Sequence, residues 1–163
     1  MNYEYGQVLL LGLWNVKFSN CYFSATAFPN TGGKYNYAIG GLSSRFHVYN
    51  NTRIEGFFTG IASGDYGSNP LAGLRAENCK FNGNFIGIDN WYGHGAFIRN
   101  NQFNGIGTHP FQPGGTSPSP RPVGLILRDC TGFAVTDNTF SGSASGDPNT
   151  IGMLAWNTGS ESN

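Results

Sequence analysis

The segment Ala96-Phe97-Ile98-Arg99-Asn100-Asn101-Gln102-Phe103-Asn104-Gly105 decides the fold, because variants of it recur along the chain. Its central hexapeptide has an apolar residue, any residue, Asn or Asp, Asn or Cys, any residue, and Phe. Four segments fit this pattern: Phe18–Phe23, Ala76–Phe81, Ile98–Phe103 and Val135–Phe140. We align a looser copy, Val48–Ile54, through Asn50, with one extra residue before its last apolar position. Repeats of this length indicate a solenoid, in which stacked units bury a common core.

A second repeated element is a Gly between two apolar residues. It occurs in Leu11-Gly12-Leu13, Ala72-Gly73-Leu74, Ile86-Gly87-Ile88, Val123-Gly124-Leu125 and Ile151-Gly152-Met153, and in a relaxed form in Ile39-Gly40-Gly41-Leu42. Between residues 124 and 142 the Gly, a short strand, a turn and the Asn-Phe unit follow one another. Leu125 and Leu127 alternate with their neighbours at the two-residue period of a strand. The sequence therefore predicts repeated short strands separated by turns.

The Asn and Asp residues of the units have a structural interpretation. Both residue types tolerate the left-handed backbone conformation of a tight corner and can bond their own backbone there. We expect stacked Asn side chains to bond one another between repeats, while the Phe rings stack in the interior. Cys21, Cys79 and Cys130 each follow the Asn or Asp of a repeat, so we expect them to occupy equivalent, small, buried positions.

These repeats resemble those of the pectin-lyase-like family of right-handed parallel β-helix proteins, over roughly residues 12–157. The resemblance implies an all-β, right-handed parallel β-helix solenoid of about five to six coils. The length of the chain fits a single domain over residues 1–163. Five prolines between residues 106 and 122 predict a Pro-rich loop excursion there. The family includes polysaccharide lyases, glycoside hydrolases, phage tailspikes and adhesins, so it predicts the fold and not one activity.

Composition excludes several partners. Nine basic and nine acidic residues give no net charge, which argues against nucleic acid and against an anionic membrane surface. The apolar run Gln7–Trp14 lacks the basic start of a signal peptide and is too short to span a bilayer, so we expect a first buried strand there. No cofactor is expected, and no metal, because the loop at 62–70 has a single acid, Asp65. Without a capping helix at either end, we expect further chain or partner subunits to cover the solenoid ends.

The turn from Asp89 to Gly95 has the most distinctive chemistry in the chain, since it combines an acid, two large aromatic residues and a histidine. The candidate ligand-binding residues are Trp91, Tyr92, Asp89 and His94, and the candidate catalytic residues are Asp89, His94 and Arg99. Gly93-His94-Gly95 resembles one motif of the polygalacturonase family. The other motifs of that family, a paired Asp, an Asn-Thr-Asp and an Arg-Ile-Lys, do not occur here.

Two further sets of residues are open to a functional interpretation. Lyases with this fold use Arg or Lys as a base, and the resemblance makes Arg75, Arg99 and Arg128 candidates at similar places in their repeats. Tyr35 and Tyr37 follow a turn at the spacing that points both rings the same way, either at the edge of the core or as a platform for a sugar.

Three functions are compatible with these observations. The first is an extracellular or cell-surface module that binds polysaccharide without catalysis, through the aromatic turn. The second is a polysaccharide lyase or glycoside hydrolase, and the third is a structural spacer or fibre segment. The aromatic turn favours the first over the third, and the missing acid pairs favour the first over the second. Export is an expectation from the family resemblance.

Overall fold

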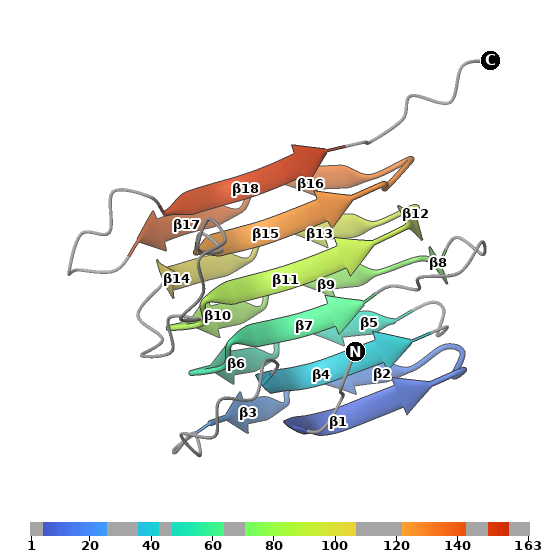
Figure 1. Ribbon diagram of the computed structural model, residues 1–163, viewed down its shortest axis with the longest axis horizontal. Helices are drawn as coiled ribbons and strands as arrows, with labels where there is room; N and C mark the ends of the chain where they lie inside the picture. Colours follow the sequence, from blue (N-terminus) through green and yellow to red (C-terminus); the bar gives the residue numbers. More distant parts are fainter. Residues whose placement is uncertain are drawn as a thin grey trace, which may run out of the picture.

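The computed structural model describes residues 5–25, 36–42, 47–63, 71–106, 122–142 and 150–156. In these residues the secondary structure consists of β-strands in parallel sheets, as predicted from the sequence (Figure 1). Sheet 1 contains, in order, β1 (Tyr5–Leu11), β4 (Asn36–Leu42), β7 (Thr59–Ser63), β11 (Ile86–Trp91), β15 (Val123–Arg128) and β18 (Ile151–Trp156). No helix in the described ranges is long and apolar enough to cross a membrane.

Two sheets of shorter strands lie behind sheet 1 (Figure 1). Sheet 2 contains β2 (Lys17–Ser19), β5 (Val48–Asn50), β9 (Arg75–Glu77), β13 (Phe97–Arg99) and β16 (Ala134–Thr136). Sheet 3 contains β3 (Tyr22–Ser24), β6 (Arg53–Glu55), β10 (Lys80–Asn82), β14 (Gln102–Ile106) and β17 (Thr139–Gly142). β8 (Leu71–Ala72) and β12 (Gly93–His94) form a separate pair. The chain visits sheets 1, 2 and 3 in turn and returns to sheet 1, an arrangement consistent with a β-solenoid.

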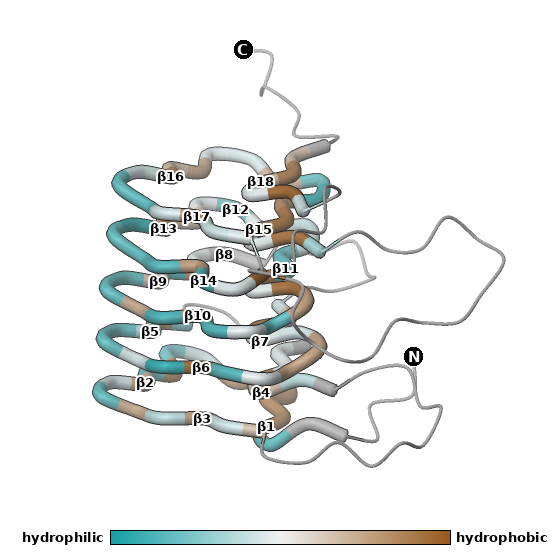
Figure 2. The backbone as a smooth tube through the Cα atoms, turned by 90° about the vertical axis from the view of Figure 1, so that its left-hand side faces the viewer, coloured by the Kyte–Doolittle hydropathy of each residue, from teal (hydrophilic) through white to brown (hydrophobic). Residues whose placement is uncertain are grey.

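The corner between sheets 2 and 3 is built from the predicted Asn positions. Five residues with positive φ occupy it, and we name them the Asn corner: Asn20, Asn51, Asn78, Asn100 and Asp137. Side-chain amides bond between neighbouring repeats there, with Nδ2 of Asn51 donating to Oδ1 of Asn20 at 2.7 Å and Nδ2 of Asn100 donating to Oδ1 of Asn78 at 2.7 Å. Figure 2 shows this corner as a hydrophilic stripe, whereas the apolar segments gather at sheet 1.

One alignment made from the sequence is wrong by a residue. Asn51, not Asn50, occupies the corner, because Tyr49 points into the core and pairs in register with Phe18 and Ala76. The Tyr49 ring stacks on the Phe18 ring at 5.5 Å and is fully buried. The copy at 48–54 therefore contains no extra residue.

The predicted Phe stack fills the interior beside sheet 3. The Phe103 ring lies 4.7 Å from that of Phe81 and 4.8 Å from that of Phe140, and Phe103 is fully buried. The rings pack against glycines of sheet 1: a Cβ added at Gly87 would meet the Phe103 ring at 2.6 Å. The predicted alternation of Leu125 and Leu127 is confirmed, since both belong to the main core, whereas Ile126 between them belongs to a second buried cluster.

The position after each Asn-corner residue also points inward. Cys79 donates from Sγ to the carbonyl of Glu77 at 3.2 Å, and the buried Asn101 occupies the equivalent position in the next repeat, where its Oδ1 accepts from the Cys79 N–H at 2.9 Å. Cys21 lies in the same column, but Cys130 does not, because it follows β15 at the corner between sheets 1 and 2. The expectation that all three cysteines stack is therefore wrong for Cys130. All three are free thiols.

Three other expectations need correction or lie outside the described residues. The run from Gln7 to Trp14 is only partly buried, since Leu10 is buried but Leu9, Leu11 and Trp14 are exposed. Tyr37 is buried in β4 and is no surface platform, while Tyr35 is not among the described residues. The Pro-rich excursion was predicted at 106–122; Ile106 ends β14, Pro122 precedes β15, and residues 107–121 are outside the described ranges.

Glycines of the second repeated element fall into two groups. Gly87, Gly124 and Gly152 lie in sheet 1 and face the interior rings. Gly12 and Gly73 adopt φ of 60° and 82° at corners, where the left-handed conformation favours glycine. The Gly between two apolar residues thus has two structural roles, one within sheet 1 and one at the corners.

Candidate functional site

The residues Asp89 and Trp91 lie on the outer face of sheet 1. Ile88 is buried in the main core, so strand alternation directs Asp89 and Trp91 to the opposite side of β11. Both residues belong to the strand, and the corner begins only at Tyr92, which has a φ of 50°. The predicted turn from Asp89 to Gly95 therefore contains the end of a strand.

Arg128 of the neighbouring strand β15 completes a cluster with these two residues. Its Nε donates to Oδ1 of Asp89 at 3.0 Å and its Nη2 donates to Oδ2 at 2.9 Å, a bidentate ion pair. Nε1 of Trp91 also donates to Oδ1 of Asp89, at 2.5 Å. The Arg128 guanidinium lies over the Trp91 ring, 4.7 Å from its centroid. The carboxylate therefore fixes the orientation of both the ring and the cation.

The surroundings of Asp89 are apolar on one side. Asp89 lies in register with Ile126, which belongs to a second buried cluster on this outer face together with Phe85, Ile86 and Val123. Asp89 is 7% exposed, and burial raises its pKa to about 6, against the opposing effect of Arg128 and of the Trp91 hydrogen bond. The carboxyl group is held inside the cluster and reaches solvent only at its edge.

Tyr92 and His94 extend the cluster around the corner toward sheet 2. Tyr92 is 42% exposed, and its N–H donates to the Arg128 carbonyl at 2.8 Å. His94 is exposed on β12, and its Nδ1 shares a hydrogen bond of 2.7 Å with Oγ1 of Thr131. We name Asp89, Trp91, Tyr92, His94 and Arg128 the aromatic corner. It presents partly exposed aromatic surface next to a cation and an imidazole.

The three catalytic candidates have separate partners. Arg99 ends β13 in sheet 2, and its Nε donates to Asp137 at 3.2 Å. Asp89 is bonded to Arg128 and Trp91, and His94 to Thr131. Hydrogen bonds therefore do not join Asp89, His94 and Arg99 into one constellation in this structure.

The three arginines proposed as equivalent lie at different places. Arg75 begins β9 and Arg99 ends β13, so they face outward from different columns of sheet 2, in register with Phe97 and Glu77 respectively. Arg128 is in sheet 1. In the part of the chain that the structure describes, no group of three or more His, Cys, Asp or Glu side chains is placed to hold a metal ion.

Sequence reasoning missed the partnership of Arg128 with Asp89 and Trp91. A signal for it exists: when Gly87 is aligned with Gly124, Trp91 falls opposite Arg128, and the structure pairs these two residues in register. The sequence matches no family model, and no curated protein or solved structure matches it.

Proposed function

We propose that this chain is a right-handed parallel β-helix of five to six coils, of the pectin-lyase-like type, that acts as an extracellular or cell-surface module and binds polysaccharide without catalysis. Parallel sheets visited in cyclic order support the fold. The function rests on one observation, the oriented Trp91 ring of the aromatic corner.

The geometry of Trp91 suits a sugar. Asp89 holds the indole through Nε1, and Arg128 packs over the ring, so the side chain is fixed before any ligand arrives. A pre-ordered aromatic group loses little conformational freedom on binding. Sugars offer apolar C–H faces that pack on such rings, and hydroxyl groups that bond nearby polar atoms. Tyr92 and His94, which follow Trp91 in the chain, are exposed and could supply further contacts.

Asp89 has a supporting role in this proposal. It is nearly buried, and its oxygens already accept three hydrogen bonds from Arg128 and Trp91. We infer that it contributes to binding by positioning those two side chains. In this proposal Trp91, Tyr92 and His94 contact the ligand.

One observation favours the enzymatic alternative. The raised pKa of Asp89, about 6, is in the range that suits a general acid. A polysaccharide lyase or glycoside hydrolase would, however, need this carboxyl to reach the substrate, and Arg128 already occupies both oxygens. The binding module therefore agrees better with the geometry.

Affinity electrophoresis through gels containing neutral and acidic polysaccharides tests the proposal. We expect retardation of the wild-type protein, and loss of retardation in Trp91→Ala. Trp14→Ala is the matched control, because Trp14 is a solvent-exposed tryptophan, at 62%, that follows the terminal strand β1 of sheet 1 and lies away from β11. Retention of binding by Trp91→Ala would contradict the site.

The same polysaccharides, incubated with the protein, are assayed for new reducing ends and for unsaturated products. Their absence is expected for a binding module. Products that disappear in His94→Ala or Asp89→Asn would establish the enzyme instead. Absence of both binding and products would favour the structural spacer or fibre segment.

A further inference from the structure

A second surface feature lies at the Asn corner, where sheets 2 and 3 meet. An open depression of about 390 Å³ is lined by Glu77, Asn78, Arg99, Asn100 and Asp137. Its residues come from three consecutive repeats, so adjacent side chains repeat at the spacing of parallel strands, about 4.8 Å. The Asn corner joins sheet 2 to sheet 3, whereas the aromatic corner lies where the chain passes from sheet 1 to sheet 2.

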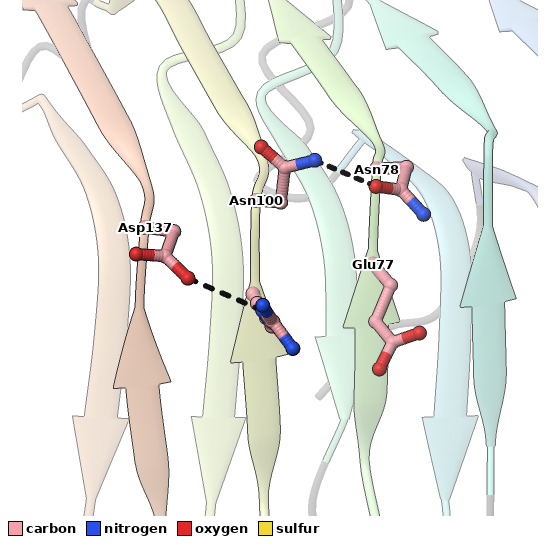
Figure 3. Close-up of a pocket in the computed structure, with 5 residues that line it drawn as sticks. Glu77, Asn78, Asn100 and Asp137 are labelled. Carbon is pink, nitrogen blue, oxygen red and sulfur yellow. Dashed lines mark hydrogen bonds and ion pairs between the residues drawn. The ribbon is translucent and has the colours of Figure 1, made fainter.

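The amide ladder of the Asn corner is interrupted inside this depression. Nδ2 of Asn100 donates to Oδ1 of Asn78 at 2.7 Å, so the oxygen of Asn100 lies on the side of Asp137 (Figure 3). An asparagine at position 137 would donate to that oxygen and continue the ladder. A carboxylate has only acceptors, so Asp137 supplies no donor to the Asn100 oxygen. This interruption leaves room for a donor from outside the chain.

Hydrogen-bonding groups of both kinds remain in the depression. Arg99 bonds Asp137 through Nε, and its two Nη groups have no partner within the described residues. Glu77 accepts from Arg75 through Oε1 alone, which leaves Oε2 available. Arg75 does not line the depression but pairs with Glu77, and Arg99 pairs with Asp137, so each acid of the lining has a basic partner. The depression therefore offers unused donors and acceptors without a dominant sign of charge.

We propose that this depression is a second carbohydrate site that binds a neutral, hydroxyl-rich glycan chain across the repeats. A hydroxyl group both donates and accepts, so one sugar hydroxyl can donate to Asn100 Oδ1 or Asp137 and accept from Arg99 Nη. A uronate carries a negative charge and would be repelled by the carboxylates of Glu77 and Asp137. A divalent cation between Asn100 and Asp137 would be repelled by the Arg99 guanidinium. The site is independent of the proposed function at Trp91.

Asp137→Asn is the decisive variant, because it supplies the missing donor from within the chain. The new amide continues the ladder, and the exposed ion pair that is lost contributes little stability. We expect thermal stability to be unchanged or slightly raised. Binding of neutral hexasaccharides, from a panel of β-1,4-glucan, α-1,4-glucan and β-1,4-mannan measured by calorimetry, should weaken roughly tenfold, as expected for one charge-assisted hydrogen bond. Arg99→Gln should weaken it by a similar factor.

Asn20→Asp is the matched control, because it makes the reverse change at an Asn-corner position outside the depression, where the oxygen still accepts from Asn51. It should bind the hexasaccharides as the wild type does. Trp91→Ala should also leave this binding intact, which separates the second site from the first. The proposal is overturned if Asp137→Asn binds as well as the wild type, if no neutral hexasaccharide binds, or if only oligogalacturonate or CaCl₂ alone binds.

Discussion

The Asn corner and the aromatic corner border the same sheet 2 but are built in opposite ways. At the Asn corner the left-handed φ recurs in all five positions, four of them Asn and the fifth Asp137. At the aromatic corner the equivalent positions differ: Tyr92 follows β11, whereas Asp129 follows β15, and both have a φ of 50°. Where the residues repeat, side chains of neighbouring repeats hydrogen-bond one another and support the fold. Where the residues differ between repeats, their side chains form interactions that the fold itself does not require.

The difference shows where to look for function in a solenoid. Most amides of the Asn corner are occupied by other amides, so their main contribution is stability. The cluster of Asp89, Trp91 and Arg128 forms only where two particular repeats meet. In the Asn corner the residue type changes at Asp137, and the neighbouring Arg99 keeps hydrogen-bonding groups that no described residue occupies. In both places the candidate site coincides with a break in the repeat.

The largest effect is expected in the core beside sheet 3, next to the Asn corner, from Phe103→Ala. This substitution removes the central ring of the Phe81, Phe103 and Phe140 stack and leaves a cavity. We expect the free energy of unfolding to fall by about 3–5 kcal/mol in a denaturant titration. Gln102→Ala, on the same strand but exposed, should change it by less than about 0.5 kcal/mol. A loss below about 1 kcal/mol for Phe103→Ala would mean that the repeat is not held by its rings.

A smaller loss is expected from Asn101→Ala, which tests whether the inward amides are also structural. Asn101 accepts from the Cys79 N–H at 2.9 Å and donates from Nδ2 to the Ala76 carbonyl at 2.9 Å. Both backbone groups would lose their partner in the core, which should cost about 2–3 kcal/mol. The control Asn104→Ala removes an exposed ladder bond of 3.2 Å to Asn82 and should cost about 0.5 kcal/mol. Equal losses in the two variants would show that burial does not distinguish these amides.

The regular corner could be predicted from the sequence because turn chemistry is local. Asn100 and Asp137 were placed correctly from the hexapeptide alone, since only a few residue types accept a positive φ. The error at Asn50 arose because Val48 appeared to be the inward residue. Tyr49 takes that place, since its ring stacks on Phe18 from another repeat. A pattern of neighbouring residues cannot predict a contact between two residues this far apart in the sequence.

The aromatic corner could be predicted only in part, for the same reason. The cluster of Asp89, Trp91 and His94 was visible because its members are close in sequence. Arg128 lies 39 residues from Asp89 and depends on the register of sheet 1. The cysteines show the same limit of prediction from a local pattern. An Asn-Cys or Asp-Cys pair occurs at two different corners, because each corner needs a residue with positive φ followed by a small residue that points inward.

Asp89→Ala tests the aromatic corner with an effect expected to be slightly smaller than that of Asn101→Ala. The change removes the carboxylate that accepts from the Arg128 guanidinium, which is 29% exposed, and from the Trp91 Nε1. Since Arg128 can turn toward solvent, we expect a loss of about 2 kcal/mol, less than for a fully buried pair. Affinity electrophoresis should show weaker polysaccharide binding, because Trp91 is no longer fixed. Unchanged stability together with unchanged binding would show that the cluster is incidental.

The smallest effect on stability is expected from a change of pH. It distinguishes the two corners, because the amides of the Asn corner do not titrate. His47, beside the corner between sheets 1 and 2, is 1% exposed; its Nδ1 lies 3.5 Å from the Tyr49 hydroxyl, and its Nε2 has no partner among the described residues. Burial lowers the pKa of His47 below its ordinary value of 6.5. The unfolded chain therefore takes up a proton more readily, so stability should fall as pH drops below about 6.5 and level off below the folded-state pKa.

Asp89 acts in the opposite sense at acidic pH. Its pKa of about 6 lies above its ordinary value of 3.8, so the folded state takes up a proton first between these values and gains stability relative to the unfolded chain. The wild-type profile alone therefore mixes two contributions. His47→Leu removes one of them, and the difference between wild type and variant, measured by denaturant titration from pH 7.5 to 5.0, isolates the histidine. A difference that does not change across this range would show that His47 is protonated as easily in the folded chain as in the unfolded one.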